Sequence, residues 1–322
     1  MSNGVSNTLA SHGHESDVAS QDSHPQWFRQ ALAKPGLSNF VQIDGVRIHY
    51  LSWNMEQTEK PALLFIHGFR AHAHWWDFIA PFFTEQYRVL AMDFSGMGDS
   101  EHRASYDVDT FANEIIGLIE ALGLAPITAV GHSYGGSRLL RACAERPDLF
   151  RHAVVVDSYV LFQGEPGPSL PKKLLGTRTY PDYASARTRY RLMPEQPFAH
   201  DFLVAHIAHH AMRELEGGWR WKFDPDMPTT GYREPDGEAV LARIDTPVDY
   251  ICGERSAVVD AKRALRTVQA LRTVRGPIMI PDGQHHLMLD QPIALITTLR
   301  ALLADTRQPN QSQSTQTPRK AQ

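Results

Sequence analysis

The sequence ITAVGHSYGG, which runs from Ile127 to Gly136, carries the strongest indication of the fold. It opens with a short apolar run typical of a buried strand, and a helical pattern follows over residues 138–145. Between them, Gly131-His132-Ser133-Tyr134-Gly135 fits G-x-S-x-G, in which a tight strand-to-helix turn holds a serine above a sheet. The glycines permit that turn. We therefore predict that Ser133 is a nucleophile, in preference to part of an ordinary Gly/Ser turn.

Strands and helices alternate on both sides of this segment. Short apolar runs predict strands over residues 62–66, 88–92, 127–130, 153–156, 248–251 and 278–280. Helices are predicted over residues 110–122, 138–145, 258–271 and 292–303. Asp44-Gly45, between the runs 40–43 and 47–50, indicates a β-hairpin with a type I′ turn. Repeated strand–helix–strand units predict an α/β fold with a mostly parallel central sheet and helices on its faces.

The alternation stops after Ser158, and residues 159–240 are rich in Pro, Gly, Arg and aromatic residues with weak periodicity. An insertion here would cover the carboxyl ends of the strands, where open α/β sheets bind ligands. We therefore expect a core formed by residues 25–158 and 241–304, with residues 159–240 as a lid. The polar segments 1–24 and 305–322 are predicted to be disordered tails.

Composition limits the class of partner. The 322 residues include 32 Lys and Arg against 36 Asp and Glu, a net charge of 32 − 36 = −4 at pH 7. This balance favours a small-molecule substrate over nucleic acid or a membrane. The N-terminal residues lack a secretory signal pattern, and no apolar run approaches the ~20 residues that span a bilayer, so we expect a cytoplasmic location. Cys143 and Cys252 lack metal-site spacing and are expected to be reduced, buried thiols.

A serine that attacks a carbonyl needs amide groups to stabilise the oxyanion of the tetrahedral intermediate. His67-Gly68-Phe69 ends the strand 62–66, and its loop is predicted to supply the amide of Phe69, with Gly68 allowing close approach. The turn itself is predicted to supply the amide of Tyr134. The residues that we expect to contact substrate are His67, Gly68, Trp75, His132 and Trp219.

The serine also needs a general base. The last predicted strand is followed by Pro281-Asp282-Gly283-Gln284-His285-His286, a loop at the same edge of the sheet as Ser133. Two adjacent histidines, His285 and His286, are therefore candidates.

Together these motifs resemble the α/β-hydrolase superfamily over residues 40–303, in particular its serine esterase-like members with a lid. Members often place the catalytic histidine seven positions before a proline, and Pro292 accordingly indicates His285 over His286. The sequence departs from the pattern at Gln284, where the family usually has glycine.

The resemblance also bears on the acid that orients the base. Members commonly carry it in a Gly-x-x-Asp segment after the strand 248–251, which here reads Gly253-Glu254-Arg255-Ser256. Other members carry it after the preceding strand, about two dozen residues beyond the nucleophile, and this implies Asp157, with Ser256 as a hydrogen-bonding auxiliary. Glu254 and Asp260 stay open as alternatives.

Other motifs fit structural roles better than catalytic ones. The glycine-containing segment 93–100 has the wrong order for a nucleotide loop and resembles a structural turn of the superfamily. His72 and His74 lie near each other, but no third ligand has a suitable spacing. His206, His209 and His210 share one helical face, which fits zinc but also lid or surface packing. We expect packing, with no metal and no cofactor.

The expected activity is hydrolysis of a small or medium carboxylic ester through an acyl-enzyme. A thioesterase, a lactonase or a C–C bond hydrolase would use the same triad. From other classes, a cofactor-free acyltransferase or perhydrolase, or a ligand-binding protein without catalysis, stays open. Dehalogenases and epoxide hydrolases of the superfamily carry Asp as nucleophile, whereas position 133 is Ser.

Overall fold

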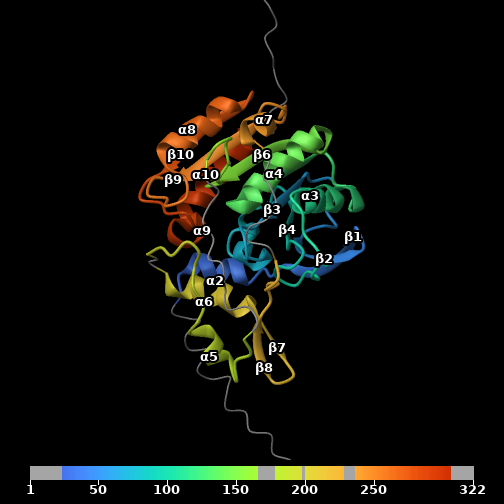
Figure 1. The fold of residues 1–322 in the computed structure, drawn as a ribbon, viewed down its shortest axis with the longest axis vertical. Helices are drawn as coiled ribbons and strands as arrows, with labels where there is room; N and C mark the ends of the chain where they lie inside the picture. Colours follow the sequence, from blue (N-terminus) through green and yellow to red (C-terminus); the bar gives the residue numbers. More distant parts are fainter. Residues whose placement is uncertain (1–23, 166–177, 198–199, 228–235, 306–322) are drawn as a thin grey trace, which may run out of the picture.

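The computed structural model describes residues 24–165, 178–197, 200–227 and 236–305. An eight-stranded sheet crosses the core in the order β1-β2-β4-β3-β5-β6-β9-β10 (Figure 1). Its strands are β1 (Leu37–Ile43), β2 (Val46–Trp53), β3 (Ala62–Ile66), β4 (Arg88–Met92), β5 (Ile127–His132), β6 (Phe150–Val156), β9 (Val248–Gly253) and β10 (Val274–Ile280). Neighbouring strands from β4 to β10 pair in parallel, while β1 and β2 pair with antiparallel neighbours. The predicted α/β fold with a mostly parallel sheet is therefore confirmed.

The β1–β2 hairpin turns at Asp44 and Gly45, as the sequence predicts. Both residues have positive φ, 48° for Asp44 and 76° for Gly45. A type I′ turn requires positive φ at both central positions, and its twist matches that of the two strands.

The sheet has an apolar layer on each face. Consecutive side chains of a strand point to opposite faces, so Leu64 and Ile66 join one core cluster while Leu63 and Phe65 join the other. The first cluster contains buried residues of α3 (Thr110–Ala121), α4 (Tyr134–Glu145), α7 (Gly237–Leu241) and α8 (Ala261–Ala270). The second contains residues of α2 (Gln26–Leu32), η1 (Ala73–Trp76), η2 (Ala80–Phe83), α6 (Asp201–His210), α9 (Leu287–Asp290) and α10 (Pro292–Asp305). The short helix η3 (Pro147–Leu149) precedes β6.

Between β6 and β9 the chain forms α5 (Tyr183–Arg187), α6 and a hairpin of β7 (Met212–Leu215) and β8 (Gly218–Trp221). Figure 1 shows these elements gathered at one end of the molecule, with α6 beside α2. By contrast, α7 packs against α4 and α8. The predicted boundary at residue 241 thus lies at the end of a helix that belongs with the core.

The predicted tails fall almost wholly outside the described residues. His24 is described, and its ring packs against Phe28 of α2 and Phe202 of α6. The helix α2, which packs against α6 through Phe28 and Phe202, is not among the elements that the sequence pattern predicts. Among the described helices, none combines the length and apolarity needed to cross a bilayer.

Candidate active site

Ser133 lies on the turn between β5 and α4, in a strained backbone conformation with φ 52° and ψ −121°. The flanking glycines are required by close packing. A Cβ on Gly131 would lie 2.7 Å from the Cα of Gly136, and one on Gly135 would lie 2.3 Å from the carbonyl oxygen of His67. The amide of Ser133 donates to the carbonyl of Val156 at 2.9 Å. Strain and anchoring together hold the hydroxyl at the carboxyl edge of the sheet.

His285 lies next to this serine. Its Nε2 is 2.9 Å from the Ser133 Oγ, and its Nδ1 is 3.1 Å from the Asp157 Oδ1. The histidine comes from the loop after β10 and the aspartate from the residue after β6, so three strand ends bring the three side chains together. Both His285 and Asp157 are buried.

Asp157 is held from several directions. Its φ is 46°, and its own amide donates to the carbonyl of Ile251 at 2.7 Å. The Oδ2 accepts from the amide of Gly253 at 2.9 Å, and the Oδ1 accepts from the Ser256 hydroxyl at 2.7 Å. A buried carboxylate is costly unless such donors surround it. Ser256, which stands where the superfamily usually has its acid, thus contacts the carboxylate as the sequence indicated.

The alternative acids lie in other contacts. Glu254 accepts from the amide of Asp282 at 3.0 Å, and Asp260 accepts from the amide of Arg263 at the start of α8. Among the described residues neither has a hydrogen bond to His285 or His286. The ring of His286 packs against Trp75, with centroids 5.3 Å apart, and its amide donates to the Gln196 Oε1 at 2.8 Å.

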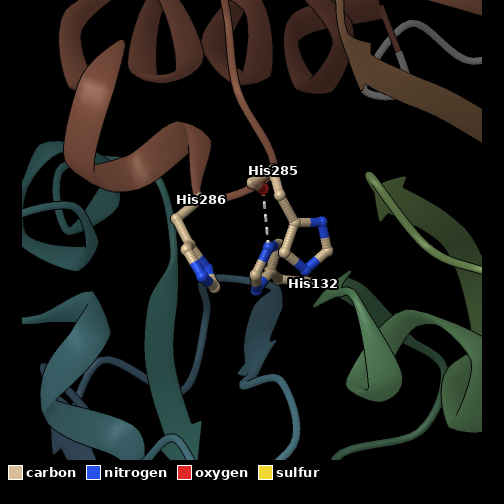
Figure 2. Close-up of side chains that lie close together, drawn as sticks. All are labelled: His132, His285 and His286. Atoms are coloured by element: carbon tan, nitrogen blue, oxygen red, sulfur yellow. Dashed lines mark hydrogen bonds between the residues drawn. The ribbon is translucent and has the colours of Figure 1, made fainter. Parts of the chain in front are cut away.

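Two further histidines lie beside the base (Figure 2). The Nε2 of His132 donates to the backbone carbonyl of His285 at 3.0 Å, so His132 holds the loop that carries the base. Burial, together with the charge that His285 can carry, keeps the pKa of His132 and of His286 well below the ordinary value. Both rings are therefore neutral near pH 7, and a protonated His285 is not opposed by two further charges.

The loop after β3 lies against the nucleophile. A Cβ on Gly68 would be 3.2 Å from the Cβ of Ser133 and 3.2 Å from the Nδ1 of His132. The rings of Phe69 and Tyr134 meet edge to face, with centroids 5.5 Å apart. The two residues predicted to supply oxyanion amides therefore lie side by side, and a glycine at 68 keeps the approach to Ser133 open.

Two residues predicted to contact substrate have partners inside the protein. His67 is buried, its Nδ1 donates to the carbonyl of Gly68 at 2.7 Å, and its Nε2 accepts from the amide of Phe94 at 3.1 Å. Its ring thus holds the loop after β3 in place. The Nε2 of His132 is likewise committed to the carbonyl of His285. These contacts give both histidines a positioning role, and their contact with substrate stays a prediction.

The two predicted tryptophans lie in different places. Trp75, in η1, is buried and packs against His286 beside the base. Trp219, in β8, packs against Tyr183 of α5 at 5.3 Å between ring centroids. Trp219 therefore packs within the segment between β6 and β9, and its contacts among the described residues do not include the triad.

The turn at 93–100 has the structural role expected of it. The buried Asp93 accepts from the Nδ1 of His49 at 2.7 Å and from the amide of Ala73 at 2.6 Å. A Cβ on Gly98, whose φ is 55°, would overlap the Asp93 carboxylate. Although burial raises its pKa, the hydrogen bond and charge of His49 outweigh that effect and hold the pKa of Asp93 well below the ordinary value.

A groove of about 1280 Å³ is lined by α6, by residues between Arg187 and Gln196, and by His24 and Pro25 just before α2. Arg187 and Arg191 line it together with Glu195 and Asp201, so both signs of charge are present. The described residues that line this groove do not include the triad. Gln196, which accepts from the amide of His286, connects its wall to the loop of the base.

Residues 63–298 match the alpha/beta hydrolase family. The chain belongs to that family. Its relatives include the human epoxide hydrolase 4, 29% identical over 290 residues that cover 81% of this chain and 78% of that protein. Another relative is 2-(acetamidomethylene)succinate hydrolase of Mesorhizobium japonicum, 25% identical with 72% of this chain and 84% of that protein covered. Hydrolase activity is thus supported by the family and by its named members.

Solved structures of the family share the fold. The thioesterase domain from the curacin biosynthetic pathway superposes with a TM-score of 0.67 at 23% identity, covering 82% of this chain and 99% of that one. The crystal structure of E-2-(acetamidomethylene)succinate hydrolase gives a TM-score of 0.66 at 19% identity, covering 84% and 99%.

Proposed function

We propose that this protein is a serine hydrolase that cleaves a small or medium carboxylic ester through an acyl-enzyme. The observation that carries the proposal is the unbroken series of contacts from Ser133 through His285 to Asp157, with distances of 2.9 and 3.1 Å. Such a series matches what acyl transfer needs: a nucleophile, a base within hydrogen-bond reach, and a carboxylate that fixes the tautomer of the base.

The proposed reaction has two steps. His285 takes the proton of Ser133 through Nε2 as the Oγ attacks the carbonyl carbon, and the oxyanion accepts from the amides of Phe69 and Tyr134. The protonated His285 then gives its proton to the leaving alcohol, and water activated by the same histidine hydrolyses the acyl-enzyme. The carboxylate of Asp157 stabilises the imidazolium, while Ser256 and Gly253 donate hydrogen bonds to its oxygens.

Position 133 separates this proposal from the chemistry named for the human relative. An epoxide hydrolase of this superfamily uses an Asp nucleophile, whose carboxylate forms an ester with the opened epoxide. A serine at this position would form an ether, which water does not readily hydrolyse. Ser133 therefore favours a carbonyl substrate.

Labelling by a fluorophosphonate probe tests the proposal. We expect the folded protein to react at Ser133 and to lose ester turnover in proportion to labelling, because the probe phosphonylates only a serine activated by a base. The control is the Ser137→Ala variant, which removes the hydroxyl one helical turn further along α4 and should label normally. Full turnover after complete treatment, or labelling at another residue, would refute the proposal. A series of p-nitrophenyl esters, with matched thioesters and lactones, then identifies the acyl group and the bond cleaved.

A further inference from the structure

Four side chains meet where the lid packs on the core. His74 and Asp77 lie in and just after η1, which follows the loop of Gly68, while His206 and His210 lie on α6. The Oδ2 of Asp77 accepts from the Nδ1 of His74 at 2.7 Å and from the Nε2 of His206 at 2.9 Å. We call these four residues the lid–core cluster. It joins segments that lie far apart in the sequence, since 129 positions separate Asp77 from His206.

Three members offer metal ligands at close range. One donor atom each of His74, Asp77 and His210 lies within 4.8 Å of the other two. The rings of His74 and His210 stack, with centroids 3.6 Å apart and planes 12° from parallel. In a tetrahedral zinc site, bonds of about 2.0–2.1 Å place the ligand atoms about 3.4 Å apart. The donor atoms therefore have to shift by about 1.4 Å or less, and because the lone pairs lie in the ring planes, the stacked rings also have to tilt towards a common ion, which side-chain rotation within the cluster can supply.

The protonation states suit a cation. Burial raises the pKa of Asp77, but hydrogen bonds from His206 and His74 outweigh this and hold it well below the ordinary value, so the group is a carboxylate. Burial and the charges of His74 and His206 lower the pKa of His210 to about 2, which leaves this imidazole neutral with a lone pair. Among the described residues, no hydrogen bond engages the ring nitrogens of His210.

His74 completes the set. Burial lowers its pKa, but the hydrogen bond and charge of Asp77 outweigh this and raise it. A metal ion would take the place of the proton between the Nδ1 of His74 and the Oδ2 of Asp77, so that both atoms become ligands. The cluster is also reachable, since the side chains of His74 and Asp77 are 17% and 13% exposed.

We propose that His74, Asp77 and His210 bind a divalent transition-metal ion, zinc by preference, and that His206 orients Asp77 from outside the ligand set. The chemistry of the donors, two imidazoles and one carboxylate with a fourth position open to water, is that of a zinc site. The ion links α6 to η1 and so fastens the lid to the core. It does so beside Trp75 of η1, which packs against His286 next to the base. The sequence lacked a third ligand of suitable spacing near His74, and the fold supplies it from α6.

A second group of histidines could compete for the same ion at the catalytic base. His132, His285 and His286 also have donor atoms within 4.8 Å of one another (Figure 2). His285 is required by the proposed reaction, so a metal there would only inhibit. The His285→Ala variant removes that group of ligands and leaves the lid–core cluster intact.

Calorimetric titration of the metal-free protein with Zn²⁺ and the absorption spectrum of its Co²⁺ form test the inference. We expect one Zn²⁺ per chain and a tetrahedral Co²⁺ spectrum, in the wild type and in His285→Ala alike. His210→Ala should weaken Zn²⁺ binding at least a hundredfold and abolish the Co²⁺ spectrum. His206→Ala should weaken binding about 10–100-fold, as for other partners that orient a ligand.

The matched control is His209→Ala, an exposed histidine on the same helix and adjacent in sequence, which should bind as the wild type does. Circular dichroism of metal-free His210→Ala checks that the helix is retained. Zn²⁺ at a hundredfold excess over its Kd should raise the Tm of the wild type by about 5 °C and that of His210→Ala by less than about 1 °C. Absence of stoichiometric binding, equal binding by His210→Ala, or loss of binding in His285→Ala would each overturn the proposal. Loss of esterase activity alone bears only on the proposed function, because these readouts do not use turnover.

Discussion

The fold contains two groups of histidines, and they are held in different ways. Around Ser133, backbone groups hold the catalytic residues in place: the carbonyl of His285 accepts from His132, and the amide of Gly253 donates to Asp157. In the lid–core cluster, one carboxylate, Asp77, holds His74 and His206 through side chains alone. The geometry of the first group is therefore set by the sheet, whereas the geometry of the second depends on how α6 packs against η1.

The largest effect is expected at the nucleophile. Ser133→Ala should lower kcat for p-nitrophenyl acetate by about a millionfold, by analogy with other serine hydrolase triads. His285→Ala should cost nearly as much, and the double variant little more, because the two residues act as a unit. Steady-state turnover of purified variants with unchanged circular dichroism measures this. A Ser133→Ala protein with more than about a tenth of wild-type activity would contradict the proposal that Ser133 is the nucleophile.

Replacing the buried acid should have the next largest effect. Asp157→Asn keeps the shape but removes the charge that stabilises the imidazolium, so we expect kcat to fall about ten-thousandfold. Glu254→Gln and Asp260→Asn are the matched controls, and their turnover should stay within twofold of the wild type. If the kcat of Glu254→Gln fell as far as that of Asp157→Asn, the assignment of Asp157 as the acid would be contradicted.

Ser256 offers a finer test of how the acid is held. Ser256→Ala deletes one donor to the Asp157 carboxylate, and a hydrogen bond to a charged group contributes about 1.5–3 kcal/mol. We expect kcat to fall about tenfold to a hundredfold with little change in KM. Ser256→Thr, which keeps the hydroxyl, should retain most activity, and failure of that rescue would argue that the residue acts through packing.

The smallest effect concerns the lid–core cluster without metal. The pKa of His74 is raised in the folded protein above its unfolded-state value of about 6.5. The ion pair of His74 with Asp77 therefore stabilises the folded state fully at pH values below the unfolded-state pKa. That stabilisation is lost as the pH rises through the folded-state pKa. In the presence of a chelator, the Tm difference between wild type and Asp77→Asn should be several degrees near pH 6. It should shrink by about 1–3 °C above pH 8. A difference that grows with pH would contradict the raised pKa.

The two regions also differ in how far the sequence could predict them. The core follows a repeating pattern in which polar residues stand just beyond strand ends, so the pattern predicted Ser133 and the loop of His285 and His286. The choice of His285 and of Asp157 came from the resemblance to the superfamily. In the fold Ser133, His285 and Asp157 lie in contact. The serine at position 256, where the superfamily usually has its acid, favoured a carboxylate from another strand end, with Glu254 and Asp260 left as alternatives.

The segment between β6 and β9 could not be predicted in the same way. The strands β7 and β8 have four residues each, too few for a clear alternation of apolar and polar side chains. The helix α6 is only weakly amphipathic, because its histidines are neither apolar nor clearly polar. Which core residues face α6 depends on tertiary packing alone. For that reason the spacing of residues in either segment did not indicate that His210 lies near His74 and Asp77. The sequence likewise did not indicate that Trp219 packs against Tyr183.

Trapping the acyl-enzyme intermediate is the most direct test that Ser133 is acylated with His285 as its base. A p-nitrophenyl ester is mixed with the protein at low pH, where deacylation is slow, and the reaction is quenched in acid for mass spectrometry of the peptides. We expect a mass increase of one acyl group on the peptide that contains Ser133, and none in His285→Ala. Product release with an unmodified Ser133 throughout turnover, or an acyl group on another residue, would contradict it.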